Sequence, residues 1–195
     1  MTAPLPPAAC DFPIDRETGL AQGAIQLPSP HCDARPPGIA IDLLVIHAIS
    51  LPAGEYGGDD VAALFLGTLD CTHRPDYGEL ANLRVSAHFL VRREGQVQQF
   101  VPVHRRAWHA GVSCFAGRER CNDFSVGIEL EGSDRDRFTA AQYAALTALT
   151  RAVRAACPAI RAENIVGHSD IAPGRKTDPG PHFDWAVYRA ALMAA

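Results

Sequence analysis

The pattern of apolar and polar positions predicts two buried strands of different kinds. Residues 41–47, IDLLVIH, are almost continuously apolar and contain several β-branched residues, which is typical of a strand buried on both faces. Residues 124–132, FSVGIELEG, alternate instead: the apolar positions 126, 128 and 130 share one face, while Gly127, Glu129 and Glu131 share the other.

Other segments carry local signals for a hairpin and for helices. Residues 85–93 and 96–103 flank Glu94-Gly95, a pair typical of a tight hairpin turn. A short helix is expected from Asp59 or Asp60.

The C-terminal third predicts two helices with a strand between them. Thr139 and Gln142 form a capping box at the start of a helix that Pro158 ends. A short strand over 164–168 and a final helix capped by Asp184 follow.

The mixed order of these elements predicts the fold class and the domain organisation. Strands alternate with helices and with one hairpin, so we expect a single α/β (mixed α+β) domain with a central mixed sheet flanked by helices. Residues 1–24 are rich in Pro and Ala and lack periodicity, which predicts a loose N-terminal arm. The folded domain is then expected over 25–195.

Composition and charge exclude several classes of protein. The chain is 47% hydrophobic and 21% charged, which argues against intrinsic disorder. A net charge of −4 argues against a nucleic-acid binder, because phosphate binding needs a positive excess. No apolar run approaches the roughly 18 residues that a membrane-spanning helix needs.

Cysteine usage and the N-terminal residues predict a compartment. The six cysteines are scattered, without a Cys-x-x-Cys pair. The first residues, MTAPLPPAACDFPID, lack the basic and apolar regions of a secretory signal. We therefore expect a cytoplasmic protein with reduced thiols.

Two histidines stand at the ends of predicted strands, where ligands gather in α/β sheets. His47 follows one buried strand and His168 follows another. Two histidines and one carboxylate would leave the open fourth position of a catalytic zinc site. Asp178 can supply that carboxylate, and Asp170 competes with it. The alternative is that the histidines only hydrogen-bond at strand ends and that Asp178 is an ordinary turn residue.

A carboxylate on a buried strand is a candidate general base, because burial raises its pKa toward the useful range. Glu129 and Glu131 share one face of their strand, and the spacing leaves open which of them would serve. The alternative is a solvent-facing pair on an edge strand. Lys176, two residues before Asp178, is either a functional cation or a solvated loop lysine.

Several long motifs in one order carry a resemblance to a known family. They are VIHAIS at 45–50, LPAGEYGG, RVSAHFLVRREGQVQQFVP, RRAWHAGVS, GRERCNDFSVGIELEG and GHSDIAPGRKTDPGP. From about Gly23 to Trp185 the chain resembles the AmpD family, the cytoplasmic 1,6-anhydro-N-acetylmuramyl-L-alanine amidases. The wider superfamily of zinc amidases includes phage lysozyme-like amidases and peptidoglycan recognition proteins, which share one fold.

The resemblance implies a zinc enzyme of cell-wall recycling. One zinc ion per chain would be held by His47, His168 and Asp178. Glu129 would be the catalytic carboxylate and Lys176 the cation beside the reacting carbonyl. The bond implied joins the lactyl group of anhydro-muramic acid to L-Ala of the stem peptide. Family members also restrain β-lactamase induction by lowering the level of anhydro-muropeptides.

Two positions compare this chain with its relatives, one with the phage-type amidases and one with the AmpD family itself. Ala87 stands where phage-type relatives carry a catalytic Tyr, and those relatives lack the acid of Glu129, so the chain follows the AmpD pattern. Ala48 departs from the Asn that is common after the first ligand, which predicts a missing or replaced hydrogen bond to substrate.

Substrate contacts are predicted at four further residues. Arg84 and Arg120 are expected to bind stem-peptide carboxylates, and Trp108 to stack on the sugar with His109 beside it. The alternatives are surface arginines in salt bridges and a Trp in the core. A small-molecule muropeptide is then the expected partner, with no nucleic acid or membrane, and we expect a monomer.

Two other functions compete with this interpretation. A non-catalytic peptidoglycan-binding module would lack a zinc ligand, Glu129 or Lys176, and all are present. An exported amidase acting on the intact wall is disfavoured by the apparent lack of a signal and by the extra cysteines.

Overall fold

A six-stranded mixed sheet forms the centre of the computed structural model, which describes residues 11–72 and 74–194. The strand order is β1-β5-β4-β9-β3-β10, and only β4 and β5 pair antiparallel. The strands are β1 (Ile25–Gln26), β3 (Leu43–Ile49), β4 (Phe89–Val91), β5 (Val97–Gln99), β9 (Ser125–Glu131) and β10 (Ile165–Gly167). The predicted mixed sheet is thus confirmed.

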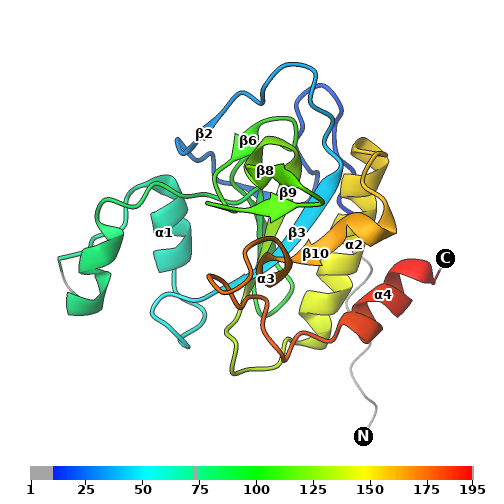
Figure 1. Cartoon of the computed structure of the whole chain (residues 1–195). Helices are drawn as coiled ribbons and strands as arrows, with labels where there is room; N and C mark the ends of the chain where they lie inside the picture. Colours follow the sequence, from blue (N-terminus) through cyan, green and yellow to red (C-terminus); the bar gives the residue numbers. More distant parts are fainter. Residues whose placement is uncertain (1–10, 73, 195) are drawn as a thin grey trace, which may run out of the picture.

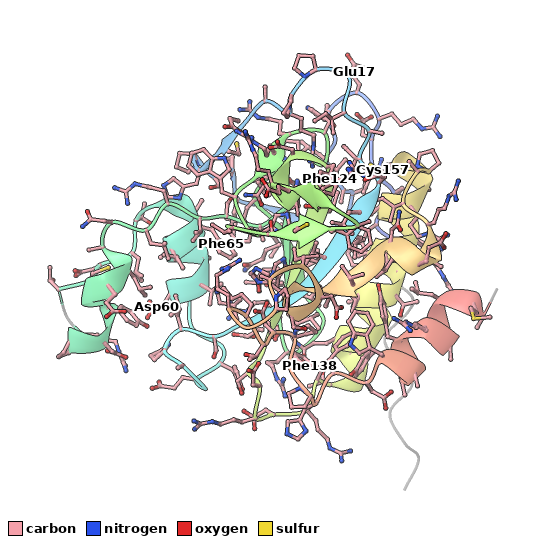
Figure 2. All side chains as sticks on the ribbon, viewed as in Figure 1. Glu17, Asp60, Phe65, Phe124, Phe138 and Cys157 are labelled. Carbon is pink, nitrogen blue, oxygen red and sulfur yellow. The ribbon has the colours of Figure 1, made fainter. Side chains whose placement is uncertain are left out.

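Helices cover both faces of this sheet (Figure 1). On one face α2 (Ala140–Ala156) and α4 (Trp185–Met193) lie side by side. The other face carries α1 (Asp60–Leu66) and the short α3 (His168–Ile171). Figure 2 shows Phe65 on the side of α1 and Phe138 near the start of α2, where each packs into a separate apolar cluster.

Small elements complete the second face. Two short ribbons pair β2 (Cys32–Asp33) with β6 (Arg106–Ala107) and β7 (Cys114–Phe115) with β8 (Arg118–Glu119). Short 3₁₀ turns in the described part of the chain are η1 (Pro75–Leu80), η2 (Cys121–Asp123) and η3 (Ala162–Asn164).

The central strands β3 and β9 explain the two sequence patterns. In β3, Leu44 and Ile46 pack toward α2, while Leu43 and Val45 belong to the cluster that contains α3. This confirms burial on both faces. In β9 the charged face is also buried, because the strand lies between β4 and β3 and is not an edge. Glu129 and Glu131 are only 8% and 3% exposed.

The N-terminal residues are more ordered than predicted. Phe12 and Ala21 are buried in the main core, and Ile14 forms an isolated bridge with Ala21. The Ala21 N–H also donates to Gln99 Oε1 at 2.7 Å. A loose arm is therefore the wrong description of residues 11–24, because apolar side chains anchor them. Residues 1–10 of that predicted arm lie outside the described residues.

Element boundaries differ from the predictions in the irregular regions. The hairpin strands span only 89–91 and 97–99, and β1 directly follows the predicted arm, where no strand was expected. His168 begins α3 rather than ending a strand. Among the described residues, no helix combines the length and apolar character needed to cross a membrane.

The predicted capping box at the start of α2 is confirmed, and it also ties the helix to the hairpin. Thr139 Oγ1 accepts from the Gln142 N–H at 3.1 Å, and Gln142 Oε1 accepts from the Thr139 N–H at 3.1 Å. The same hydroxyl donates to the Arg93 carbonyl at 2.6 Å.

Thr139→Ala should lower the free energy of unfolding by about 1 kcal/mol, because it removes the cap acceptor of α2. Urea denaturation followed by circular dichroism measures this value. Thr139→Ser keeps the hydroxyl and should lose less than half as much. Equal stability of the alanine variant and the parent would contradict the assigned role of the cap.

Candidate metal centre and active site

Three side chains from separate segments meet at one edge of the sheet. His47 Nδ1 lies 2.9 Å from His168 Nδ1, and Asp178 Oδ2 lies 3.1 Å from each of these two atoms. His47 ends the buried part of β3, His168 begins the helix after β10, and Asp178 follows on the next loop. Both histidines are almost fully buried.

This arrangement fits a metal ion. The three atoms are potential metal ligands within 4.8 Å of one another. A single proton cannot form hydrogen bonds with all three of them at once. Burial lowers the pKa of His47 to about 4, so its imidazole is neutral, as ligation requires. Burial opposes ionisation of Asp178, but hydrogen bonds with His168 and His47 outweigh it and hold the pKa of that carboxyl below its usual value.

The competing carboxylate has another task. Asp170 is exposed, and its Oδ2 accepts from the Gly167 N–H at 2.7 Å at the start of α3. Asp170 therefore stabilises the turn that presents His168, and Asp178 is the carboxylate at the metal centre.

A carbonyl behind His168 fixes the orientation of its ring. His168 Nε2 lies 3.2 Å from the Ala110 carbonyl oxygen, so its N–H donates there and leaves Nδ1 unprotonated for a metal. Arg175 donates to the same carbonyl and to that of Val112, both at 2.7 Å. Arg175 thus holds the segment on which His168 depends.

The loop that carries Asp178 is fastened to the loop after β9. The Thr177 hydroxyl donates to the Asp134 carboxylate. Gly180 has φ +85°, and a Cβ there would lie 2.7 Å from Asp134 Oδ1, so the two loops meet closely only because residue 180 is Gly. The Ser169 N–H donates to the Asp178 carbonyl at 3.0 Å, which ties the loop to α3 as well.

Glu129 lies opposite His47 in the register of β3 and β9. Its Oε1 is 4.0 Å from His47 Nδ1, and its buried Oε2 has no hydrogen-bond partner among the residues that the structure describes. Burial, and then the charge of Asp178, raise the pKa of Glu129 well above its usual value, while the charge of Lys176 opposes the rise. An unpaired carboxyl oxygen with a raised pKa beside a metal centre is suited to proton transfer.

Glu131 is engaged elsewhere. Its Oε1 accepts from the Gly57 N–H at 2.7 Å, and its Oε2 accepts from the Arg93 N–H at 3.1 Å. Arg92 Nε lies 3.3 Å from the same Oε2. Glu131 therefore holds the glycine-rich loop of residues 51–58 in place. Of the two glutamates on this face, Glu129 is the one with an oxygen that has no hydrogen-bond partner among the described residues.

The other predicted residues lie at different depths. Lys176 is exposed, and its charge reaches Glu129. Trp108 is half-buried and stacks on His31 with the rings 6.1 Å apart. Arg84 is exposed and donates to the Ala81 and Leu83 carbonyls.

Arg120 lines a hollow whose lining includes none of the three candidate metal ligands. The hollow has a volume of about 490 Å³ and lies between the β7–β8 ribbon and the segment 171–175. The Arg120 side chain is 71% exposed and lies 3.2 Å from an Asp123 oxygen, and Arg175 lines the same hollow. Arg120 is thus on a surface that small polar molecules can reach.

His109 is half-buried like Trp108, and its ring lies on the side of the His47 ring away from His168 and Asp178. Its Nδ1 is 2.9 Å from His47 Nε2, and its Nε2 is 3.0 Å from Ser125 Oγ. Burial and the neighbouring histidines lower its pKa well below the usual value. Its main-chain N–H donates to Asn122 Oδ1 at 3.1 Å.

Sequence reasoning missed Arg175, Asn122, Asp134 and Ser125, which support the site through contacts between distant segments that no periodicity encodes. One signal was present. Gly127 interrupts a buried strand, and a glycine there often marks the close approach of another group. That group is the ring of His109.

Comparison with known proteins identifies the family of this chain. The profile of the N-acetylmuramoyl-L-alanine amidase family matches residues 37–181. The chain is 58% identical over 176 residues to the 1,6-anhydro-N-acetylmuramyl-L-alanine amidase AmpD of Escherichia coli. The alignment covers 90% of this chain and 96% of the relative.

Solved structures share the fold. A crystal structure of a selenomethionine derivative of AmpD superposes with a TM-score of 0.88 at 55% identity, over 92% of this chain and 98% of the other. The amidase AmiD from Escherichia coli, solved with the substrate anhydro-N-acetylmuramic acid-L-Ala-D-γ-Glu-L-Lys, gives 0.59 at 31% identity, over 83% and 62% of the two chains. This chain belongs to the N-acetylmuramoyl-L-alanine amidase family.

Proposed function

We propose that the protein is a zinc-dependent amidase that hydrolyses the bond between the lactyl group of 1,6-anhydro-N-acetylmuramic acid and L-Ala of the stem peptide. The observation that carries the proposal is the set of three ligand atoms beside the unpaired oxygen of Glu129. High identity to a relative of that printed activity supports the substrate. Two histidines and one carboxylate are the ligand set of an open catalytic zinc site.

Each residue of the site has a role in amide hydrolysis. His47, His168 and Asp178 would hold zinc, which supplies Lewis acidity toward the amide and the attacking water. Glu129 accepts the proton of the water and delivers it to the leaving nitrogen of L-Ala. Lys176 stabilises the negative charge that develops on the carbonyl oxygen.

The remaining contacts are assigned by chemistry and position. Arg120, which lines the hollow beside the β7–β8 ribbon, is suited to a stem-peptide carboxylate, and Arg84 offers a second exposed guanidinium. Trp108 presents a half-buried ring suited to stacking on the sugar.

Ala48 bears on specificity for the anhydro end. Its side chain packs against the core cluster under α2, on the strand face opposite His47. Its small side chain therefore contacts the core, and selection of the sugar falls to the residues around the metal centre.

We place this activity in the cytoplasm, acting as a monomer in peptidoglycan recycling. The thiols of Cys32, Cys71, Cys114, Cys121 and Cys157 are all free, which fits a reducing compartment. Cys10 lies outside the described residues.

Kinetics on two substrates test the proposed function. The value of kcat/KM for an anhydro-muropeptide should exceed that for the matching reducing-end muropeptide by at least about tenfold, a difference of about 1.4 kcal/mol in transition-state binding. Chelation should abolish turnover, and added zinc should restore it. Equal kcat/KM values would mean a general wall amidase, and turnover that resists chelation would contradict the metal centre.

Substitution of the two glutamates separates the base from its neighbour. Glu129→Gln keeps the shape of the side chain but loses the proton acceptor, so kcat should fall by about 10²–10⁴ while zinc content is unchanged. Glu131→Gln weakens the clasp on the loop and should lower thermal stability with much less effect on kcat. Normal turnover in Glu129→Gln together with loss in Glu131→Gln would reverse the assignment.

The raised pKa of Glu129 also predicts how stability changes with pH in the metal-free protein. Above the ordinary Glu pKa of 4.5 the unfolded chain loses this proton while the folded protein keeps it. The free energy of unfolding contributed by Glu129 therefore falls as pH rises from there toward the folded pKa. Glu129→Gln has no proton to lose and escapes this decline.

Thermal denaturation of chelator-treated protein between pH 5 and pH 8, a range above the ordinary Glu pKa of 4.5, measures the effect. The Tm of Glu129→Gln minus the Tm of the parent should become more positive as pH rises. A difference that does not change with pH would show that Glu129 is not held in a site that opposes its charge.

A further inference from the structure

Among the described residues, the Nε2 atom of His47 has one hydrogen-bond partner, which comes from the loop after β6. His47 Nε2 lies 2.9 Å from His109 Nδ1, and the two rings meet edge to face with centroids 5.0 Å apart. The near nitrogen, Nδ1, faces His168 and Asp178. The contact with His109 is therefore on the side of the ring opposite the metal centre.

The direction of hydrogen bonding along this chain of groups follows from ligation. A neutral His47 whose Nδ1 binds metal carries its proton on Nε2, so it donates to His109 Nδ1. His109 then carries its proton on Nε2 and donates to Ser125 Oγ, 3.0 Å away. Each nitrogen of the two rings thus has one defined role.

The His109 ring packs against the backbone of the sheet. A Cβ on Gly127 would lie 2.5 Å from His109 Cγ and 2.6 Å from Nδ1, distances at which atoms clash. The ring therefore lies directly against the backbone of β9, and only Gly at position 127 permits it. Asn122 fixes the main chain of the same residue through its Oδ1. A glycine in a buried strand weakens that strand, so the space it leaves serves a purpose.

We propose that His109 is a positioning residue for the metal ligand His47. The His109 ring packs against Gly127 and accepts a hydrogen bond from His47 Nε2–H. It thereby holds the His47 ring with its Nδ1 toward His168 and Asp178. The proposal rests on the metal site of the proposed function and assigns His109 to ring orientation in place of contact with the sugar. Partners of this kind raise ligand basicity and fix ring orientation in metal sites.

Two substitutions distinguish a hydrogen-bond role from simple packing. His109→Leu fills much of the ring volume but offers no acceptor. His109→Asn fills less volume, yet its Oδ1 can take the place of Nδ1. A packing role predicts that Asn is the more harmful change, and a positioning role predicts that Leu is.

The zinc dissociation constant, measured by competition with a chromogenic chelator, gives the readout without any assay of turnover. His109→Leu should weaken zinc binding by about 10- to 100-fold, and His109→Asn should recover most of that loss. The visible spectrum of the cobalt-substituted protein should change with Leu and stay near that of the parent with Asn. His182→Leu, the same change at an exposed histidine, is the matched control and should change neither.

Gly127→Ala supplies a second, independent test. The added methyl group displaces the His109 ring, so zinc binding should weaken in the parent but hardly at all in the His109→Leu background, where the ring is gone. Such non-additivity is the mark of residues that act through one contact. Ser125→Ala, a milder change, should weaken zinc binding several-fold even if Gly127→Ala folds poorly.

The outcomes are distinct. Parent-like zinc affinity in His109→Leu, or additive losses in the double variant, would overturn the positioning role while leaving the metal site intact. A parent protein that binds no zinc, or that binds it equally well after His47→Ala, would overturn the proposed metal site itself.

Discussion

The parallel register of β3 with β9 and β10 is the constraint on which the site depends. It pairs His47 with Glu129 and brings Gly167 beside Ile46, so that His168 begins next to the end of β3. Carboxyl ends of parallel strands meet at one edge of a sheet, and ligands gather there. A slip of one residue would turn His47 into the core under α2 and bring Ala48 to the metal centre.

The site concentrates polar groups that the rest of the interior avoids. Glu129 is buried with one unpaired oxygen, whereas Glu131, two residues along the same face, is fully engaged by Arg92 and by two main-chain N–H groups. Burying a polar atom without a hydrogen-bond partner costs free energy, so the contrast supports the proposal that Glu129 serves the reaction and Glu131 serves the structure. The fold tolerates the first because apolar clusters on both faces of the sheet supply the stability.

Patterns along the chain predicted the parts of the fold that are periodic. The run at 41–47, the alternation at 124–132 and the Thr139 capping box each corresponded to an element in the structure. Residues 11–24 did not, because Phe12 anchors them through a contact distant in sequence. His168 was placed by its proximity to a strand, although its backbone is already helical.

The metal ligands could be predicted, whereas most of the residues that hold them in position could not. His47, His168 and Asp178 are candidates by side-chain type and position, and the family resemblance is what assigned them to a metal; the structure brings the three together. The choice between Asp178 and Asp170 needed the geometry of the turn, because both follow His168 at plausible distances. Loop contacts such as Thr177 with Asp134 leave no trace in hydropathy. The contact of His109 with Gly127 did leave a signal in the sequence, because a glycine stands within a buried strand. Only the three-dimensional structure identifies His109 as the group that packs against it.

The central claim is that this edge of the sheet directs water to one amide bond. Hydrolysis of an anhydro-muropeptide in ¹⁸O-enriched water, followed by mass spectrometry of the products, tests it most directly. The account predicts one ¹⁸O atom in the lactyl carboxylate of the anhydro-sugar and an unlabelled peptide with a free amine on L-Ala. Label in a peptide carboxylate instead, or an intact sugar–peptide bond with zinc present, would contradict it.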